Sequence, residues 1–463
     1  MKIPMMTLRR LLFCLGFCLM LSTSILVRVV FEETSDTRSL LTSADSVRQV
    51  SLLEGNDSDR NLRFPSVDDR VKLYMSNWYV PPCPGNSIQV NHVNATILTI
   101  QESTTTEQAA NNKKARTLVV SSEIEVDRIF FLDRDIVSHC AQNVPPPNKS
   151  KYRHSRYCKD VQSMLMPALD QVDDDAMTPV FLQFGDGKRS SGHGLVNIPY
   201  IRKIRSSTTR ASLFNVTSNH CYSGPRDPLH TKHDNGHLQP ILWKLNSERH
   251  YSMLPGVQHD DIPWKLKINM AVFRGSLTGV SRTEASSNTN FDFCMHSRRC
   301  RLVFRHGKST LVDARLTSTI GLINNTLNGV ELTGSSLSMK RQLQYKALIM
   351  VEGNDVATGL KWALLSNSVV MMQPPSHTSW AMEELLEPWV HFIPLNEELS
   401  DVEEKMQWVL DNDEQAQQIA ERGTLWIHDF VLHPDAASDE KLIQEEIIRR
   451  YRAHFAVDDV SVQ

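Results

Sequence analysis

One segment of the sequence joins an apolar strand, a polar turn and a helix in the order that suits anion binding. Residues 345–365 read YKALIMVEGNDVATGLKWALL. Gly353 permits a tight turn and close approach of a ligand to the backbone. Asn354 or Asp355 can cap a helix opening there, and the free N–H groups of a first helical turn attract anions. The pattern predicts a phosphate-binding turn at the carboxyl end of a strand.

Two residues further along the same segment extend this prediction. Thr358 and Lys361 fall on the first turns of the expected helix, where a hydroxyl and an ammonium could reach a diphosphate. An ordinary β–α turn with a surface lysine is the alternative interpretation, because the segment is neither a Walker loop nor a GxGxxG fingerprint.

A second apolar strand delivers an arginine followed by small residues. Arg274, Gly275 and Ser276 follow Phe273, and Arg282 comes shortly after. Arginine suits bidentate phosphate contacts, and glycine leaves the backbone open to a ligand. A strand end with a structural arginine is the alternative.

A third strand, at residues 180–184, ends in Gly185 and Asp186. A carboxylate at a strand end in a cleft is suited to act as a general base, and a simple turn aspartate is the alternative. The histidines at 230, 233 and 237 have the spacing of a helical metal site, but Pro228 and Gly236 argue against a helix there. We therefore expect no metal site.

These residues must be positioned by alternating strands and helices. Strands are expected at residues 117–121, 128–132, 180–184, 347–351, 368–372 and 389–394. A helix at 356–365 between two of these strands makes the strand–helix–strand unit of a parallel sheet. Ser400 and Glu403 form a capping box before a helix, a second helix restarts at Asn412 or Asp413, and a last one spans about 438–455. The fold class is α/β.

The ordered motifs resemble those of glycosyltransferase family 90, which groups fungal capsule xylosyltransferases, animal protein O-glucosyltransferases and bacterial lipopolysaccharide glycosyltransferases. The resemblance runs from about residue 179 to about 430. It rests on FLQFGD at 181–186, PILWKLNSERHY at 240–251, VFRGS at 272–276, the segment at 345–370, EPWVHFIPL at 387–395 and the helical stretch at 401–423. The form of EGNDVATGLKW is closest to the bacterial branch.

The resemblance implies two facing Rossmann-like domains of the GT-B type and an inverting transfer of a hexose or pentose from a UDP-sugar, without a required metal or other cofactor. Asp186 matches the family's catalytic base. Arg274, Gly275 and Ser276 match its donor-binding motif, with Arg282 as a following basic residue and Lys346 in a matching Tyr-Lys pair.

One position departs from the animal enzymes of that family. They carry an arginine that contacts the diphosphate where this chain has Gly359, and the nearest cation here is Lys361. The remaining donor-site positions implied are Gly353, Asp355 and Thr358. The competing hypothesis is a catalytically inactive lumenal carbohydrate-binding or structural member of the family.

The N-terminus and the cysteines indicate the compartment. Residues 11–27 carry no charge and follow Lys2, Arg9 and Arg10, which predicts a signal anchor with a lumenal body; a cleaved signal peptide is the alternative. Five N-x-S/T sequons and six cysteines outside the apolar run fit a lumenal body, with Cys294 and Cys300 close enough to form a disulfide. We expect a single-pass type II protein of the Golgi or ER membrane.

The length of the chain and its net charge limit the number of domains and the classes of partner. A chain of 463 residues exceeds one ordinary core. We expect a tail and anchor at 1–31, a stem at 32–70, an acceptor-side domain at 71–265 and a nucleotide-sugar-binding domain at 266–455. The formal net charge of -3 gives no basic footprint for a nucleic-acid partner. The expected partners are a UDP-sugar, a glycan or glycoprotein acceptor, and the membrane.

Overall fold

The fold is taken from a computed structural model. It describes residues 64–85, 87–90, 97–100, 116–119, 129–131, 157–172, 180–184, 199–207, 221, 239–280 and 289–457. Residues 65–463 form one compact unit. The two-domain division at residue 265 and the GT-B arrangement stay predictions.

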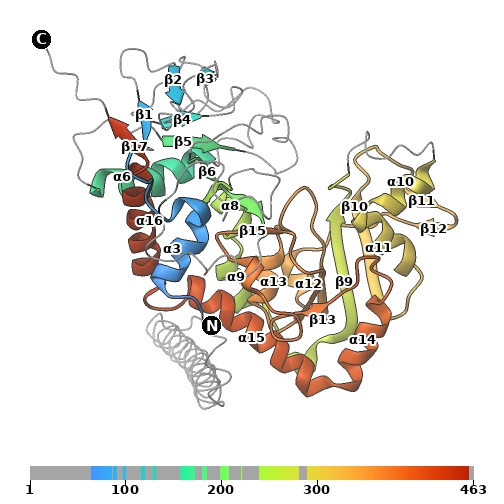
Figure 1. Cartoon of the computed structure of the whole chain (residues 1–463). Coiled ribbons are helices and arrows are strands. Elements are labelled where there is room, and N and C mark those ends of the chain that lie inside the picture. The colour runs from blue at the N-terminus through green and yellow to red at the C-terminus, as the bar shows by residue number, and fades with distance from the viewer. Residues whose placement is uncertain are drawn as a thin grey trace, which may run out of the picture. The chain divides into compact units, whose positions relative to one another are not determined.

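The C-terminal half is built on a parallel sheet of five strands (Figure 1). Its order is β10-β9-β13-β14-β16, and all four pairings are parallel. The strands are β9 (Ile268–Ser276), β10 (Val312–Ser318), β13 (Tyr345–Met350), β14 (Val369–Met372) and β16 (Ile393–Pro394). All of β14 and the middle of β13 are buried, as expected where both faces of a parallel sheet are covered. The predicted strand–helix–strand unit is confirmed by β13, α13 and β14.

Helices cover this sheet and supply its core. They are α10 (Asn290–His296), α11 (Arg298–His306), α12 (Met339–Gln342), α13 (Leu360–Leu364), α14 (Val402–Asp411) and α15 (Asp413–Val431). The helix α11 begins because the Ser297 hydroxyl accepts a hydrogen bond from the Cys300 N–H at 3.3 Å. Its apolar side buries Leu302 and Val303 in the core beneath β9 and β10.

A second parallel sheet lies in the N-terminal half. Its order is β4-β5-β6-β8, with strands Ile129–Phe131, Val180–Gln183, Ile201–Arg202 and Ile241–Leu242. The strands expected at 128–132 and 180–184 are thereby confirmed, and β3 (Arg116–Val119), paired with β2 (Ile97–Ile100), confirms that at 117–121.

The end of the chain returns to this N-terminal half (Figure 1). The last helix, α16 (Ala436–Arg452), packs against α3 (Val67–Met75) and α6 (Met166–Gln171). After it, β17 (Phe455–Val457) pairs with β1 (Ile88–Val90). Because α3 begins at Val67 and buries Arg70, residues 67–70 belong to the folded body and not to the expected stem.

Buried polar contacts tie the two sheets together. The strand β7 (Ile204–Ser206) pairs antiparallel with β15 (His377–Ser379). Beside this pairing, Lys203 forms an ion pair with Asp355 at 2.7 Å, and Arg205 forms a bidentate pair with Glu384 at 2.5 and 3.0 Å. These contacts fix the segments after β13 and β14 against the N-terminal half.

The remaining elements are short and connect these parts. They are the 3-10 helices η1 (Ser76–Trp78), η4 (Trp264–Leu266) and η5 (Glu383–Leu385), the π-helical turn η2 (Val161–Leu165), the helices α8 (Ser247–His250) and α9 (Leu254–Asp260), and the hairpin of β11 (Thr326–Leu327) with β12 (Val330–Glu331).

Two local predictions are wrong. The helix α14 begins at Val402 after Asp401 without a side-chain cap, and the Ser400 hydroxyl accepts a hydrogen bond from the Asn396 side chain instead. The strand expected at 389–394 is present only at Ile393–Pro394, and Trp389, at its expected start, has a left-handed backbone with φ of 65°.

The disulfide predicted between Cys294 and Cys300 is confirmed, and Cys83 pairs with Cys221. Cys158 is also disulfide-bonded. Within the described ranges, which exclude residues 1–63, no helix is long and apolar enough to cross a membrane. The expected anchor at 11–27 lies outside those ranges.

A buried histidine makes the fold sensitive to acid. The Nε2 of His454 lies 2.8 Å from the Trp78 carbonyl oxygen, and its ring meets the Trp78 ring edge-on. Burial lowers the pKa of His454 to about 4, although the hydrogen bond to Trp78 opposes the shift. The folded state thus keeps His454 neutral while the unfolded chain protonates near its ordinary pKa of 6.5.

We expect this difference to remove about 3 kcal/mol of unfolding free energy as the pH falls from 6.5 to 4, with the full contribution present above 6.5. Urea unfolding of wild type and His454→Gln at pH 7.5 and pH 4.5 checks this. The variant should lose less stability between the two pH values. An equal loss would show that His454 is not the responsible group.

Candidate functional site

The carboxyl ends of β13 and β14 meet at a small pocket. Its lining combines apolar side chains with two carboxylates, an amide and an imidazole: Met350, Glu352, Val356, Ala357, Leu360, Met372, Gln373, Pro375, His377 and Glu383. This is the edge at which parallel α/β sheets bind ligands. The pocket has the composition of a small-molecule site, with an apolar surface and a few polar groups.

Two glycines allow the segments after β9 and β13 to touch. A Cβ on Gly279 would lie 2.5 Å from the carbonyl oxygen of Gly353, and a Cβ on Gly353 would lie 2.3 Å from Thr278 Oγ1. Gly279 also has φ of +86° and donates its N–H to Asn354 Oδ1 at 3.0 Å. The close approach of a ligand expected at Gly353 stays a prediction, and the group that approaches Gly353 here is the protein's own segment at Thr278 and Gly279.

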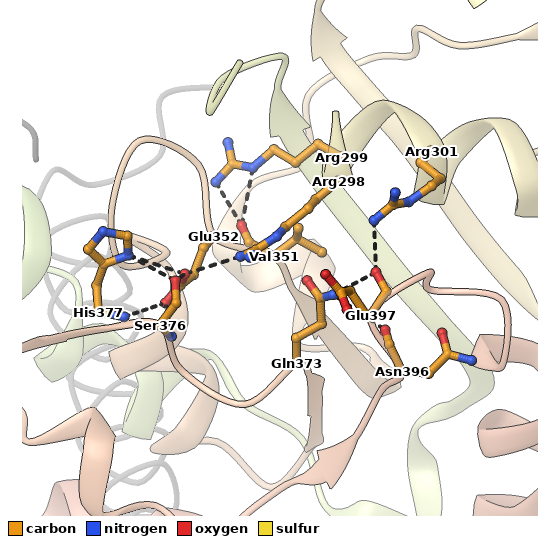
Figure 2. Close-up of polar contacts among 10 residues, drawn as sticks. All are labelled: Arg298, Arg299, Arg301, Val351, Glu352, Gln373, Ser376, His377, Asn396 and Glu397. Carbon is orange, nitrogen blue, oxygen red and sulfur yellow. Dashed lines mark hydrogen bonds and ion pairs between the residues drawn. The ribbon is translucent and has the colours of Figure 1, made fainter. Parts of the chain in front are cut away.

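A part-buried arginine joins the ends of the same two strands, and Figure 2 shows its contact with Val351. Arg299 donates from Nε and Nη2 to the Val351 carbonyl at 3.1 and 2.8 Å, and from Nη1 to the Ser276 carbonyl at 3.0 Å. Burial lowers the pKa of Arg299 to about 10, and the charge of Asp355 opposes the shift. The guanidinium therefore stays cationic at neutral pH while it fixes the geometry of the site.

Glu352 organises the other side of the pocket (Figure 2). Its Oε1 accepts the backbone N–H groups of Ser376 at 3.0 Å and His377 at 3.2 Å. Its Oε2 accepts the Ser376 hydroxyl and lies 3.3 Å from His377 Nδ1. Burial favours the neutral acid, but hydrogen bonds from His377 and Ser376 outweigh it and hold the pKa of Glu352 below its ordinary value.

Arg298 is an accessible cation at this edge. Its side chain is 42% exposed and makes one ion pair, from Nη1 to Glu352 Oε2 at 3.4 Å. A guanidinium with most of its donors facing solvent can bind an anion without breaking a strong contact.

Arg274, predicted to contact the diphosphate, is engaged elsewhere. Its five N–H groups reach the carbonyls of Ser335, Phe273 and Asp313 and both carboxylate oxygens of Asp313, at 2.8 to 3.2 Å. No donor of its guanidinium is left for a ligand in this arrangement. Gly275 and Ser276 end β9 beside Arg299, and their donor-binding role stays a prediction.

The two predicted lysines also have protein partners. Lys346 lies near the amino end of β13, at the opposite end from Glu352, where it pairs with Asp413 at 2.6 Å over the Trp264 ring. Lys361 is fully buried and pairs with Glu383 at 2.6 Å. Their locations argue against direct contact with a donor.

The helix predicted to open at Asp355 begins five residues later, which corrects the anion-site hypothesis. The helix α13 spans Leu360–Leu364, and its N-cap is Gly359. Asp355 is buried in the ion pair with Lys203, so its carboxylate does not cap the helix. Thr358 lies half-buried in the turn before α13. A helix of this length offers no N-terminal anion site.

Several predicted positions lie outside the described residues. These are Asp186, Arg282 and the histidines at 230, 233 and 237. Within the ranges given above, no group of three or more His, Cys, Asp or Glu side chains is arranged to hold a metal ion.

The sequence analysis missed the residues that the structure brings together. Arg298, Arg299, Glu352 and His377 come from three separate segments. The signal available was the Arg298-Arg299 pair directly after a residue suited to cap a helix, beside a cysteine expected to be cross-linked.

Comparison with known proteins agrees with the motifs. The family model for glycosyl transferase family 90 matches residues 249–436. The O-glucosyltransferase LpsA of Dichelobacter nodosus is 30% identical over 190 residues, covering 41% of this chain and 51% of that protein. Human protein O-glucosyltransferase 1 is 29% identical over 175 residues, covering 37% of this chain and 40% of the relative.

The chain thus spans about half the length or less of these relatives. The matched range contains the ends of β9 and β13 and the pocket, and it excludes Asp186. Residues 249–436 of this chain are therefore a glycosyl transferase family 90 domain.

Proposed function

We propose that this chain is an inverting glycosyltransferase that moves a hexose or pentose from a UDP-sugar to a hydroxyl of a glycan or glycoprotein acceptor. The observation that carries the proposal is the position of the pocket. It lies at the carboxyl edge of a parallel sheet, within a family 90 domain, beside an accessible guanidinium. The relatives named as O-glucosyltransferases support the reaction class.

The proposed donor lies with its uridine against the apolar lining, which includes Val356, Ala357 and Met372. Its diphosphate faces Arg298, whose charge offsets the negative charge that grows on the leaving group. We propose that this contact takes the place of a metal ion, so that activity survives a chelator.

In the proposed reaction the acceptor hydroxyl oxygen attacks the anomeric carbon as the bond from that carbon to the UDP oxygen breaks. The hydroxyl proton passes to Asp186, which acts as general base. Attack opposite the leaving group inverts the anomeric configuration. Asp186 rests on the motif resemblance. The position of the donor is supported by the pocket and Arg298. We also propose that the chain has two facing Rossmann-like domains of the GT-B type.

The proposed setting is the Golgi or ER membrane, with a single-pass type II anchor and the body in the lumen. The disulfides at Cys83–Cys221 and Cys294–Cys300 support an oxidising compartment.

Replacing Arg298 tests the donor site. Arg298→Ala should weaken UDP binding about 10- to 150-fold, because a charge-assisted contact contributes about 1.5–3 kcal/mol. Isothermal calorimetry of the full-length protein with UDP measures this. Arg305→Ala is the matched control, since Arg305 lies on the same helix and pairs with Glu398 away from the pocket. Equal UDP affinity in wild type and Arg298→Ala would refute the placement.

The second candidate function is a catalytically inactive, carbohydrate-binding family member. It is favoured by one observation, that the family match leaves Asp186 outside. Such a protein would bind UDP or a glycan without releasing UDP from any UDP-sugar.

A further inference from the structure

A histidine in the pocket has one ring nitrogen held by the protein and one open to a ligand. His377 lines the pocket, and its side chain is 23% exposed. Its Nδ1 lies 3.3 Å from Glu352 Oε2 and 3.1 Å from Ser376 Oγ. In the described part of the chain, Nε2 has no hydrogen-bond partner. Figure 2 shows the Nδ1 edge turned toward Glu352 and the other nitrogen turned away.

The neighbours of Nδ1 determine which nitrogen carries the proton. Ser376 donates its single hydroxyl hydrogen to Glu352 Oε2. Its oxygen therefore faces His377 Nδ1 as an acceptor. The Glu352 carboxylate is also an acceptor. Both partners therefore require a hydrogen on Nδ1, and the neutral imidazole then has an unprotonated Nε2.

The carboxylates among the other polar lining groups are engaged, and the amide oxygen of Gln373 is a second acceptor without a partner in the described residues. Both oxygens of Glu383 accept hydrogen bonds from Ser379, and Oε1 also pairs with Lys361. The amide nitrogen of Gln373 is anchored on the Asn396 and Glu397 carbonyls. Glu352 is occupied as described above. The imidazole of His377 is thus a lining group whose acceptor is held in place by its neighbours and left open.

We infer that His377, oriented by Glu352, accepts a hydrogen bond through Nε2 from an O–H or N–H group of the bound UDP-sugar. The inference rests on the proposed function. His377 is the residue that contacts the ligand, and Glu352 is the positioning residue that sets its tautomer.

A pair of substitutions separates these roles. In His377→Asn the side-chain amide can still donate to Glu352, but the acceptor at Nε2 is gone. In Glu352→Gln the new amide can donate to Nδ1, which moves the imidazole proton to Nε2 and turns the acceptor into a donor. Both variants should therefore weaken the ligand contact. If Glu352 acts through His377 and not through its ion pair with Arg298, the double variant should be no worse than His377→Asn.

The experiment uses full-length wild type, both single variants and the double variant. UDP dissociation constants come from calorimetry, and kcat and KM from UDP release with whichever UDP-sugar wild type turns over. We expect His377→Asn to raise the donor KM about threefold to tenfold, as for a lost neutral hydrogen bond, with kcat changed less than about threefold. A parallel rise in the UDP dissociation constant assigns the contact to the nucleotide, and a rise in KM alone assigns it to the sugar.

His433→Asn is the matched control, because His433 also faces a carboxylate, Asp435, but lies outside the pocket. If wild type binds UDP and His377→Asn matches it in KM and dissociation constant, the inference fails and the proposed function stands. If the Glu352→Gln effect adds fully to that of His377→Asn, the positioning role fails. If wild type neither binds UDP nor turns over a UDP-sugar, both proposals fall.

Discussion

Asp186→Asn is expected to lower kcat by about 10²- to 10⁴-fold, the range that a positioned general base contributes. The UDP dissociation constant should change little, because the proposed diphosphate contact is Arg298 and the proposed nucleotide surface is the apolar lining at residues 356–357. Asparagine keeps the size of aspartate but cannot take a proton from the acceptor hydroxyl. UDP release under saturating donor and acceptor measures kcat, and calorimetry measures UDP binding.

Asp170→Asn serves as the control for this prediction, since Asp170 is an exposed carboxylate on α6. Loss of activity in Asp186→Asn alone supports the assigned base. A variant with wild-type kcat would move the base to another residue, and a variant that also loses UDP binding would indicate a structural role for Asp186.

Lys361→Ala is expected to destabilise the fold by about 3–5 kcal/mol, the usual consequence of removing one partner of a buried ion pair. The side chains of Lys361 and Glu383 are 0% and 1% exposed, so water cannot replace the lost partner. Glu383 would keep only its hydrogen bonds from Ser379. Lys361→Met combined with Glu383→Gln should recover part of the loss, because the double change removes both charges.

Urea unfolding at neutral pH measures these free energies. Lys441→Ala is the control, since Lys441 is 61% exposed and its pair with Glu445 should contribute less than about 1 kcal/mol. A Lys361→Ala protein of wild-type stability that has lost UDP binding would restore the original donor-site interpretation of Lys361. A destabilised protein that still binds UDP would confirm the structural role.

The sequence was sufficient to predict elements with strong local patterns. The apolar runs at β5, β13 and β14 became strands because nothing in their burial pattern competed with that choice. The restart of a helix at Asp413 and the Cys294–Cys300 bridge were likewise predictable from spacing alone. Boundaries were less certain: the helix expected at Asp355 begins at Leu360 because Lys203, far away in sequence, draws Asp355 into an ion pair.

The candidate site was predictable in place and not in detail. The turn after β13 does border the pocket, through Glu352, a residue that the sequence pattern did not single out. The sequence could not separate ligand-binding cations from structural ones, because it shows a charged residue without showing the residue that it pairs with. Arg274 and Lys361 were predicted to bind the diphosphate. In the structure they form ion pairs with Asp313 and Glu383, respectively. The sequence pattern did not single out Arg298, which the fold leaves exposed beside the pocket.

UDP release from purified full-length protein tests whether this chain transfers sugar from a UDP-sugar. The protein would be incubated with UDP-glucose, UDP-xylose and UDP-galactose, with a chelator present. We expect release of UDP from at least one of these donors, by transfer or by slow hydrolysis, and its loss in Asp186→Asn. If folded wild-type protein released no UDP from any of the three donors, it would not be a UDP-sugar glycosyltransferase.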